Sequence, residues 1–85
     1  MKPESTIFGL MKAKFTAIIR KEEDQFVALC PDLDIASQGN NQREALDNLR
    51  EAVSLFLETA SPAEVEGRLS DESWITQFEA DYATT

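Results

Sequence analysis

The chain has 85 residues, of which 42% are hydrophobic and 28% are charged, with one cysteine and no histidine. This length and composition predict one small globular domain, and they exclude an internal disulfide and the usual histidine-based catalytic and zinc sites. Sixteen acidic and eight basic side chains give a net charge of −8. Such a charge disfavours direct binding to a nucleic acid duplex, and it suits either a basic partner or solubility alone. No apolar run is long enough for a signal peptide or a membrane span, so we expect a cytoplasmic protein.

The first half of the chain has the pattern of short strands. We expect residues 1–10 to be a lead-in segment and residues 11–85 to form a single domain, with either Met1 or Met11 as the natural start. The β-branched and aromatic run from Lys14 to Lys21 predicts a first strand, and the charged residues 22–24 predict a hairpin turn.

Two further strands are expected after the hairpin turn. The run QFVALC, residues 25–30, predicts a second strand that ends before Pro31, because proline cannot donate a ladder hydrogen bond. Residues 35–38 predict a third strand, which the pair Gly39-Asn40 ends because both residues tolerate positive φ.

The strongest local pattern is that of a long helix. Asn41 can serve as the N-cap, and Glu44 three residues later completes a capping box. Eight apolar residues then follow at the spacing of one helical face: Ala45, Leu46, Leu49, Ala52, Val53, Phe56, Leu57 and Ala60. Ser61-Pro62 is expected to end this helix and to begin a short helical turn that reaches Gly67, with Glu64 in its first turn.

The C-terminal segment alternates apolar and polar residues from Trp74 to Tyr82. Ile75, Phe78 and Tyr82 also fit helical spacing, but alternation over nine residues favours a half-buried last strand. Its acidic neighbours favour a core or interface position for these aromatic side chains over a base-stacking surface.

These elements predict an α+β fold of order β-β-β-α-β, in which one long helix covers one face of a small antiparallel sheet. The sequence leaves open which second-strand residues share the face of Ile19: Phe26, Ala28 and Cys30, or Val27 and Leu29. Apolar groups remain on both faces in either case, and one helix covers only one. We therefore expect self-association into a dimer or larger oligomer.

No catalytic, cofactor-binding or metal-binding constellation is expected. No lysine or arginine lies within four positions of Cys30 in the sequence, so its thiolate is not favoured. Cys30 also ends an apolar strand, which is typical of a buried small hydrophobic residue. Asp32 and Asp34 could bind a divalent cation, but aspartate is also common after proline in turns. Gly39 lacks the further glycines and the lysine of a phosphate-binding loop.

Residues 15–58 resemble the HicB-type antitoxin family. The resemblance rests on a hairpin, a cysteine-proline-acid-leucine turn, a Gln-Gly step, a capped helix start, and two glutamate-alanine pairs in the helix. The residues concerned are Cys30, Pro31, Asp32, Leu33, Gln38, Gly39, Asn41, Glu44, Ala45, Glu51 and Ala52. The family often has threonine where Asn41 stands, and both residues cap helices.

The resemblance implies a partially degraded ribonuclease-H-like fold without nuclease activity, oligomers, and binding to a small basic toxin, HicA, that cleaves messenger RNA. The antitoxin would occlude the toxin's active site. Many family members carry a C-terminal DNA-binding module. Only Thr84 and Thr85 follow the segment ITQFEADYA, residues 75–83, which stands where the family places its last strand, so we expect no such module.

An alternative is a stand-alone oligomeric interaction module of HicB fold without a toxin, and a metal-dependent enzyme is disfavoured. The acidic outer face of the long helix, with Asp47, Glu51 and Glu58, is the candidate partner contact, although a charged outer face is usually only solvated.

Overall fold

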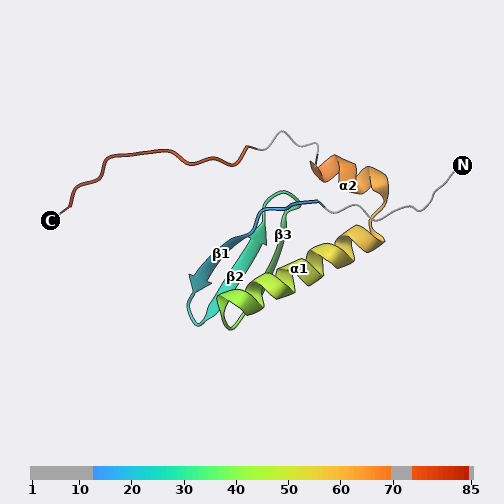
Figure 1. Cartoon of the computed structure of the whole chain (residues 1–85), viewed down its shortest axis with the longest axis horizontal. Coiled ribbons are helices and arrows are strands. Elements are labelled where there is room, and N and C mark those ends of the chain that lie inside the picture. Colours follow the sequence, from blue (N-terminus) through green and yellow to red (C-terminus); the bar gives the residue numbers. More distant parts are fainter. Residues whose placement is uncertain (1–12, 70–73, 85) are drawn as a thin grey trace, which may run out of the picture.

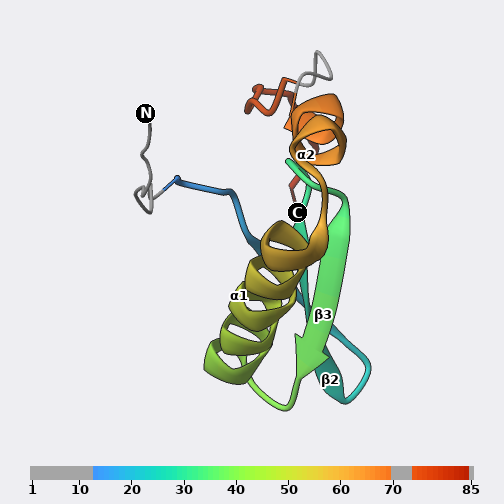
Figure 2. The ribbon, with the colours of Figure 1, turned by 90° about the vertical axis from the view of Figure 1, so that its right-hand side faces the viewer.

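The protein is described by a computed structural model that covers residues 13–69 and 74–84. Three antiparallel strands form one sheet: β1 (Ile18–Glu22), β2 (Gln25–Cys30) and β3 (Ile35–Gly39), with β2 in the centre. Two helices follow, the long α1 (Gln42–Thr59) and the short α2 (Pro62–Leu69). Figure 1 shows α1 lying along the sheet, and Figure 2 shows the helix and the sheet as two layers. The chain is therefore a small α+β protein, as its sequence predicts.

The hairpin loop determines which side chains face α1. Glu22 pairs with Gln25, so the loop has only two residues, and Ile19 pairs with Ala28. Phe26, Ala28 and Cys30 therefore share the face of Ile19, which is the first of the two arrangements that the sequence leaves open. The opposite face carries Ile18, Val27, Leu29 and Ala36, and no described helix covers it.

The core lies between α1 and the covered face of the sheet. It consists of six buried residues: Ala28, Cys30, Leu33, Ala45, Leu49 and Val53. The helix contributes residues spaced four apart, which is the spacing of one helical face. Leu33 and Cys30 are the largest fully buried side chains, so the turn after β2 belongs to the core. For a chain this small, each such side chain is a large part of the total stability.

The first strand is shorter than predicted, because it begins at Ile18 and not at Lys14. The ladder register places Ile18 opposite Leu29, so Thr16 would lie opposite Pro31, which has no N–H to donate. The N–H of Thr16 instead donates to the Asp32 carboxylate over 3.3 Å. Proline thus ends the ladder on both strands.

Both helix starts follow their sequence signals. Asn41 accepts a 2.8 Å hydrogen bond from the N–H of Glu44, and the Glu44 carboxylate accepts from the N–H of Asn40, so the predicted capping box is confirmed with a shift of one residue. Ser61 accepts from the N–H of Glu64 over 3.1 Å, and α2 continues past the predicted end at Gly67.

The predicted last strand is wrong. Residues 74–84 form neither strand nor helix, and Trp74, Phe78 and Tyr82 are 85, 88 and 83% exposed. Among the described residues the order is therefore β-β-β-α-α. The alternation of apolar and polar residues predicts which side chains share a face of an extended segment. It does not predict whether a neighbouring strand pairs with that segment, which a strand also requires. The predicted lead-in at residues 1–10, and Met11, lie outside the described residues.

Candidate protein-binding surface

Four of the residues on which the predicted resemblance to the HicB family rests lie in the core or join the sheet to α1. Cys30 and Leu33 are buried, and the N–H of Leu33 donates to the carbonyl of Cys30 across the turn over 3.3 Å. The main-chain carbonyl of Gln38 accepts a 2.8 Å hydrogen bond from the side-chain amide of Asn48, which joins β3 to α1. Ala45 is fully buried in the core. These positions therefore have structural roles.

Gly39 is required for a different reason from the one predicted. No described glycine has a positive φ. Gly39 is buried, and a Cβ built on it would lie 2.5 Å from the nitrogen of Ala45 and 2.8 Å from the carbonyl carbon of Glu44. The first turn of α1 packs directly on this backbone, so any larger residue would push the helix away from β3.

Asp32 and Asp34 are turn residues in the structure. The Asp32 carboxylate bonds to Thr16, and Asp34 has a φ of 58°, a left-handed conformation that aspartate tolerates better than most residues. Within residues 13–69 and 74–84, no three His, Cys, Asp or Glu side chains come together as a metal-binding group.

The outer surface of α1 carries a line of acidic side chains. Asp47, Glu51 and Glu58 are separated by four and seven residues, which places them within one narrow stripe along the helix axis. All three are exposed and lie on the side of α1 away from the buried residues Ala45, Leu49 and Val53. We call Asp47, Glu51 and Glu58 the acidic stripe.

The members of the acidic stripe have different local partners. Asp47 pairs with Arg50 one turn later, over 3.1 Å between carboxylate and guanidinium, and both groups are half-exposed or more. Glu58 lies in the last turn of α1, where no basic residue accompanies it. A carboxylate there faces the negative end of the helix dipole, which costs about 0.3–1 kcal/mol. The sequence therefore keeps this charge at a position where local helix stability disfavours it.

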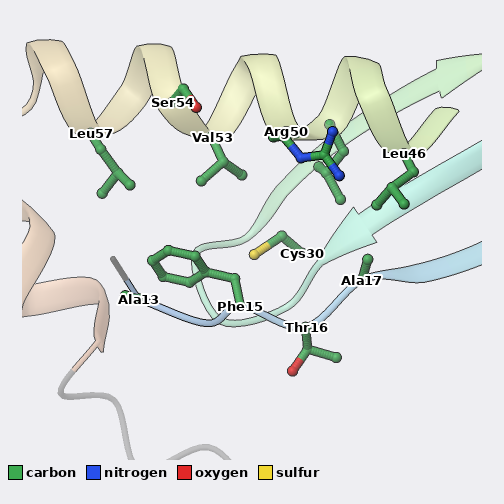
Figure 3. Close-up of a pocket in the computed structure, with 11 residues that line it drawn as sticks. Ala13, Phe15, Thr16, Ala17, Cys30, Leu46, Arg50, Val53, Ser54 and Leu57 are labelled. Carbon is green, nitrogen blue, oxygen red and sulfur yellow. The ribbon is translucent and has the colours of Figure 1, made fainter. Parts of the chain in front are cut away.

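A second surface feature, a groove beside α1, was not predicted from the sequence. A groove of about 590 Å³ runs between α1 and residues 13–17, beside β1. Figure 3 shows Val53 and Leu57 reaching from α1 toward the ring of Phe15, with Cys30 beside it. Leu46 and Leu57 fit the apolar face of the helix, and the sequence therefore predicts them as core residues. They line an open groove because no described segment covers them.

Arg68 is a structural residue that no sequence signal indicated. Its guanidinium donates a 2.6 Å hydrogen bond to the carbonyl of Leu33 and lies 4.5 Å from the ring centroid of Phe56. These contacts hold α2 against the turn after β2 and against the end of α1. The partners are distant in the sequence, so only the folded chain brings them together.

Neither described helix combines the length and the apolar character that crossing a membrane requires. Comparisons with models of known protein families, with curated proteins and with solved structures found no match to this chain.

Proposed function

We propose that the protein is an antitoxin of the HicB type, which binds a small, basic, messenger-RNA-cleaving toxin of the HicA type and occludes its active site. The observation that carries the proposal is the acidic stripe on α1. Asp47, Glu51 and Glu58 lie in line, exposed, on the face of the helix that the core does not use. A line of negative charge on a rigid helix is complementary to a basic protein that binds RNA.

The position of Glu58 favours a binding surface over one that is merely solvated. A solvated helix face would be more stable with a basic residue in its last turn, and this helix has an acidic one. Residues that lower the stability of their own helix without a structural reason are common at functional surfaces. The net charge of −8 adds long-range attraction to any basic partner.

The proposal has consequences for fold, location and assembly. It assigns the chain to a partially degraded ribonuclease-H-like fold, supported by the order of three antiparallel strands followed by a long helix. It places the protein in the cytoplasm, where messenger RNA is cleaved, and it gives the chain no nuclease activity of its own. It also expects a dimer or larger oligomer, because Ile18, Val27, Leu29 and Ala36 form an apolar face that no described helix covers.

Co-expression with a neighbouring gene tests the proposal. The probe is the product of a short open reading frame beside this gene that is rich in lysine and contains histidine. We expect that product to arrest growth when expressed alone, and we expect this protein to restore growth. Growth arrest that this protein does not relieve would contradict the proposal, and so would the absence of any such reading frame.

A second function is favoured by one observation, the exposed aromatic side chains of residues 74–84. They suit a stand-alone interaction module whose only partner is a copy of itself. Under that function the protein would self-associate, and no basic protein would bind the acidic stripe. Replacing Glu51 by Lys would then leave every interaction of the protein unchanged.

A further inference from the structure

Residues 74–84 expose more aromatic surface than any other described part of the chain. Trp74, Phe78 and Tyr82 are 85, 88 and 83% exposed, and Ile75 is 53% exposed. Figure 1 shows this segment as an extended chain that does not pack on α1 or the sheet. Several exposed large apolar side chains in one short segment of a small protein indicate a site of interaction.

An extended backbone would divide these side chains between two faces. Trp74, Phe78 and Tyr82 fall on one face, while Glu79 and Asp81 fall on the other. The small residues Thr76 and Ala80 separate the aromatic rings. The segment therefore has the character of a strand with one aromatic face and one acidic face.

The same molecule has an unpaired strand edge and an open apolar groove. Among the described residues β1 pairs only with β2, so its outer edge is unpaired. The groove lies between α1 and residues 13–17, which lead directly into β1, and it is lined mainly by apolar side chains, including Phe15, Leu46, Val53 and Leu57 (Figure 3). A strand added to this edge would direct every second side chain beneath α1, into the groove.

Charge favours the β1 edge over the other open edge of the sheet. β1 contains Arg20, Lys21 and Glu22, and Lys14 precedes it, so this edge carries a net positive charge, whereas β3 (Ile35–Gly39) contains no charged residue. Arg20 pairs with Val27 on the face that α1 does not cover. An added strand that directs its aromatic face toward α1 would direct Glu79 and Asp81 toward the same face as Arg20.

We propose that residues 74–84 of one copy of this chain add as a strand to the outer edge of β1 in a second copy, with Trp74, Phe78 and Tyr82 in the groove. The exchange is reciprocal and gives a dimer. An aromatic side chain buries about 150–250 Å², so two exchanged segments bury about 900–1,500 Å² through their rings alone. Specific interfaces bury about 1,200–2,000 Å² in total, so the exchange is large enough for a stable dimer.

The acidic stripe lies outside this interface, because the groove uses a different side of α1. The proposal concerns the site of self-association and goes beyond toxin binding, so strand exchange can fail while toxin binding holds, and toxin binding can fail while strand exchange holds. Residues 74–84 of the same chain are the alternative occupant of the groove, and the experiment below separates the two.

Trp74 is the only tryptophan, so its fluorescence reports directly on this segment. In the full-length protein at about 100 μM we expect a dimer by sedimentation and a blue-shifted tryptophan emission that shifts to the red on dilution into monomer. A monomer with exposed tryptophan would overturn the proposal. A monomer with a blue-shifted, concentration-independent emission would place the segment on its own chain and would also overturn it.

Paired substitutions test both sides of the interface. Phe78→Asp should weaken dimerisation at least about 30-fold, whereas Gln77→Asp, the same change of charge on the other face of the segment, should weaken it less than about threefold. Leu57→Arg in the groove should act like Phe78→Asp, and Leu55→Arg on the far side of α1 should act like the control. Phe78 is 88% exposed and Leu57 is 38% exposed, so circular dichroism should show intact folding in each variant. A dimer insensitive to both Phe78→Asp and Leu57→Arg would overturn the proposal.

Discussion

The guanidinium of Arg68 donates a 2.6 Å hydrogen bond to the main-chain carbonyl of Leu33, a residue 35 positions earlier in the chain. Leu33 is almost completely buried, and the same guanidinium lies over the ring of Phe56. One side chain therefore joins α2, the turn after β2 and the end of α1. The short helix depends on this contact, because α2 has no buried residue of its own.

Removing that side chain should detach α2. We expect Arg68→Ala to lower the free energy of unfolding by about 1.5–3 kcal/mol, since a hydrogen bond from a charged donor and a cation–π contact are lost together. Urea denaturation measures the change, and hydrogen exchange should show faster exchange in α2 than in the sheet. Arg68→Lys should retain part of the stability because the positive charge remains. Equal stability of Arg68→Ala and the wild type would show that the contact contributes nothing.

The two described glycines should respond to alanine in opposite directions. Gly39→Ala places a Cβ 2.5 Å from a main-chain nitrogen of α1, so we expect a loss of at least about 2 kcal/mol in the free energy of unfolding. Gly67→Ala meets no atom within 4 Å and lies inside α2, so it should be neutral or stabilise by up to about 1 kcal/mol. Thermal denaturation of the two variants compares them directly. Gly39→Ala at wild-type stability would rule out the close approach of helix and strand.

The cap of α1 gives a third prediction. Asn41→Ala should reduce the free energy of unfolding by about 1 kcal/mol, because the N–H of Glu44 loses its acceptor. Asn41→Thr keeps a side-chain oxygen in place and should restore most of that loss. Chemical denaturation of both variants is the measurement. A loss of the same size in Asn41→Thr would mean that the amide makes a contact other than the cap.

Glu58 should show opposite effects on stability and on binding. Glu58→Lys places a positive charge in the last turn of α1, so we expect the free energy of unfolding to rise by about 0.3–1 kcal/mol. The same variant should bind the basic partner more weakly than the wild type, with a reduced dependence on salt. Glu66→Lys, an equal change of charge on the exposed surface of α2, is the control and should affect binding less. Unchanged binding by Glu58→Lys would remove the acidic stripe from the interface.

The elements with local signals were predictable from the sequence. Pro31 marks the end of β2, Gly39-Asn40 marks the end of β3, and the Asn41–Glu44 cap marks the start of α1. The structure has its element boundaries at these residues. These signals act through the residue itself or through neighbours within one turn. The same locality explains why the start of α2 was predicted and its full length was not.

The remaining features depend on contacts between distant residues. The side chains that face α1 follow from the two-residue hairpin loop, and the short β1 follows from the pairing of Thr16 with Asp32. Residues 74–84 show this dependence most clearly. Their apolar and polar side chains alternate as in a strand, but the segment pairs with no strand of the described sheet. The groove and the Arg68 contact are likewise properties of the folded chain.

The most direct test of antitoxin function is an RNA cleavage assay with purified proteins. The product of the short, basic reading frame beside this gene is incubated with messenger RNA alone, and then with an equimolar amount of this protein or of its Glu51→Lys variant. We predict cleavage by the basic protein alone, suppression by the wild type, and weaker suppression by the variant. Cleavage that continues unchanged in the presence of the wild-type protein would contradict antitoxin function.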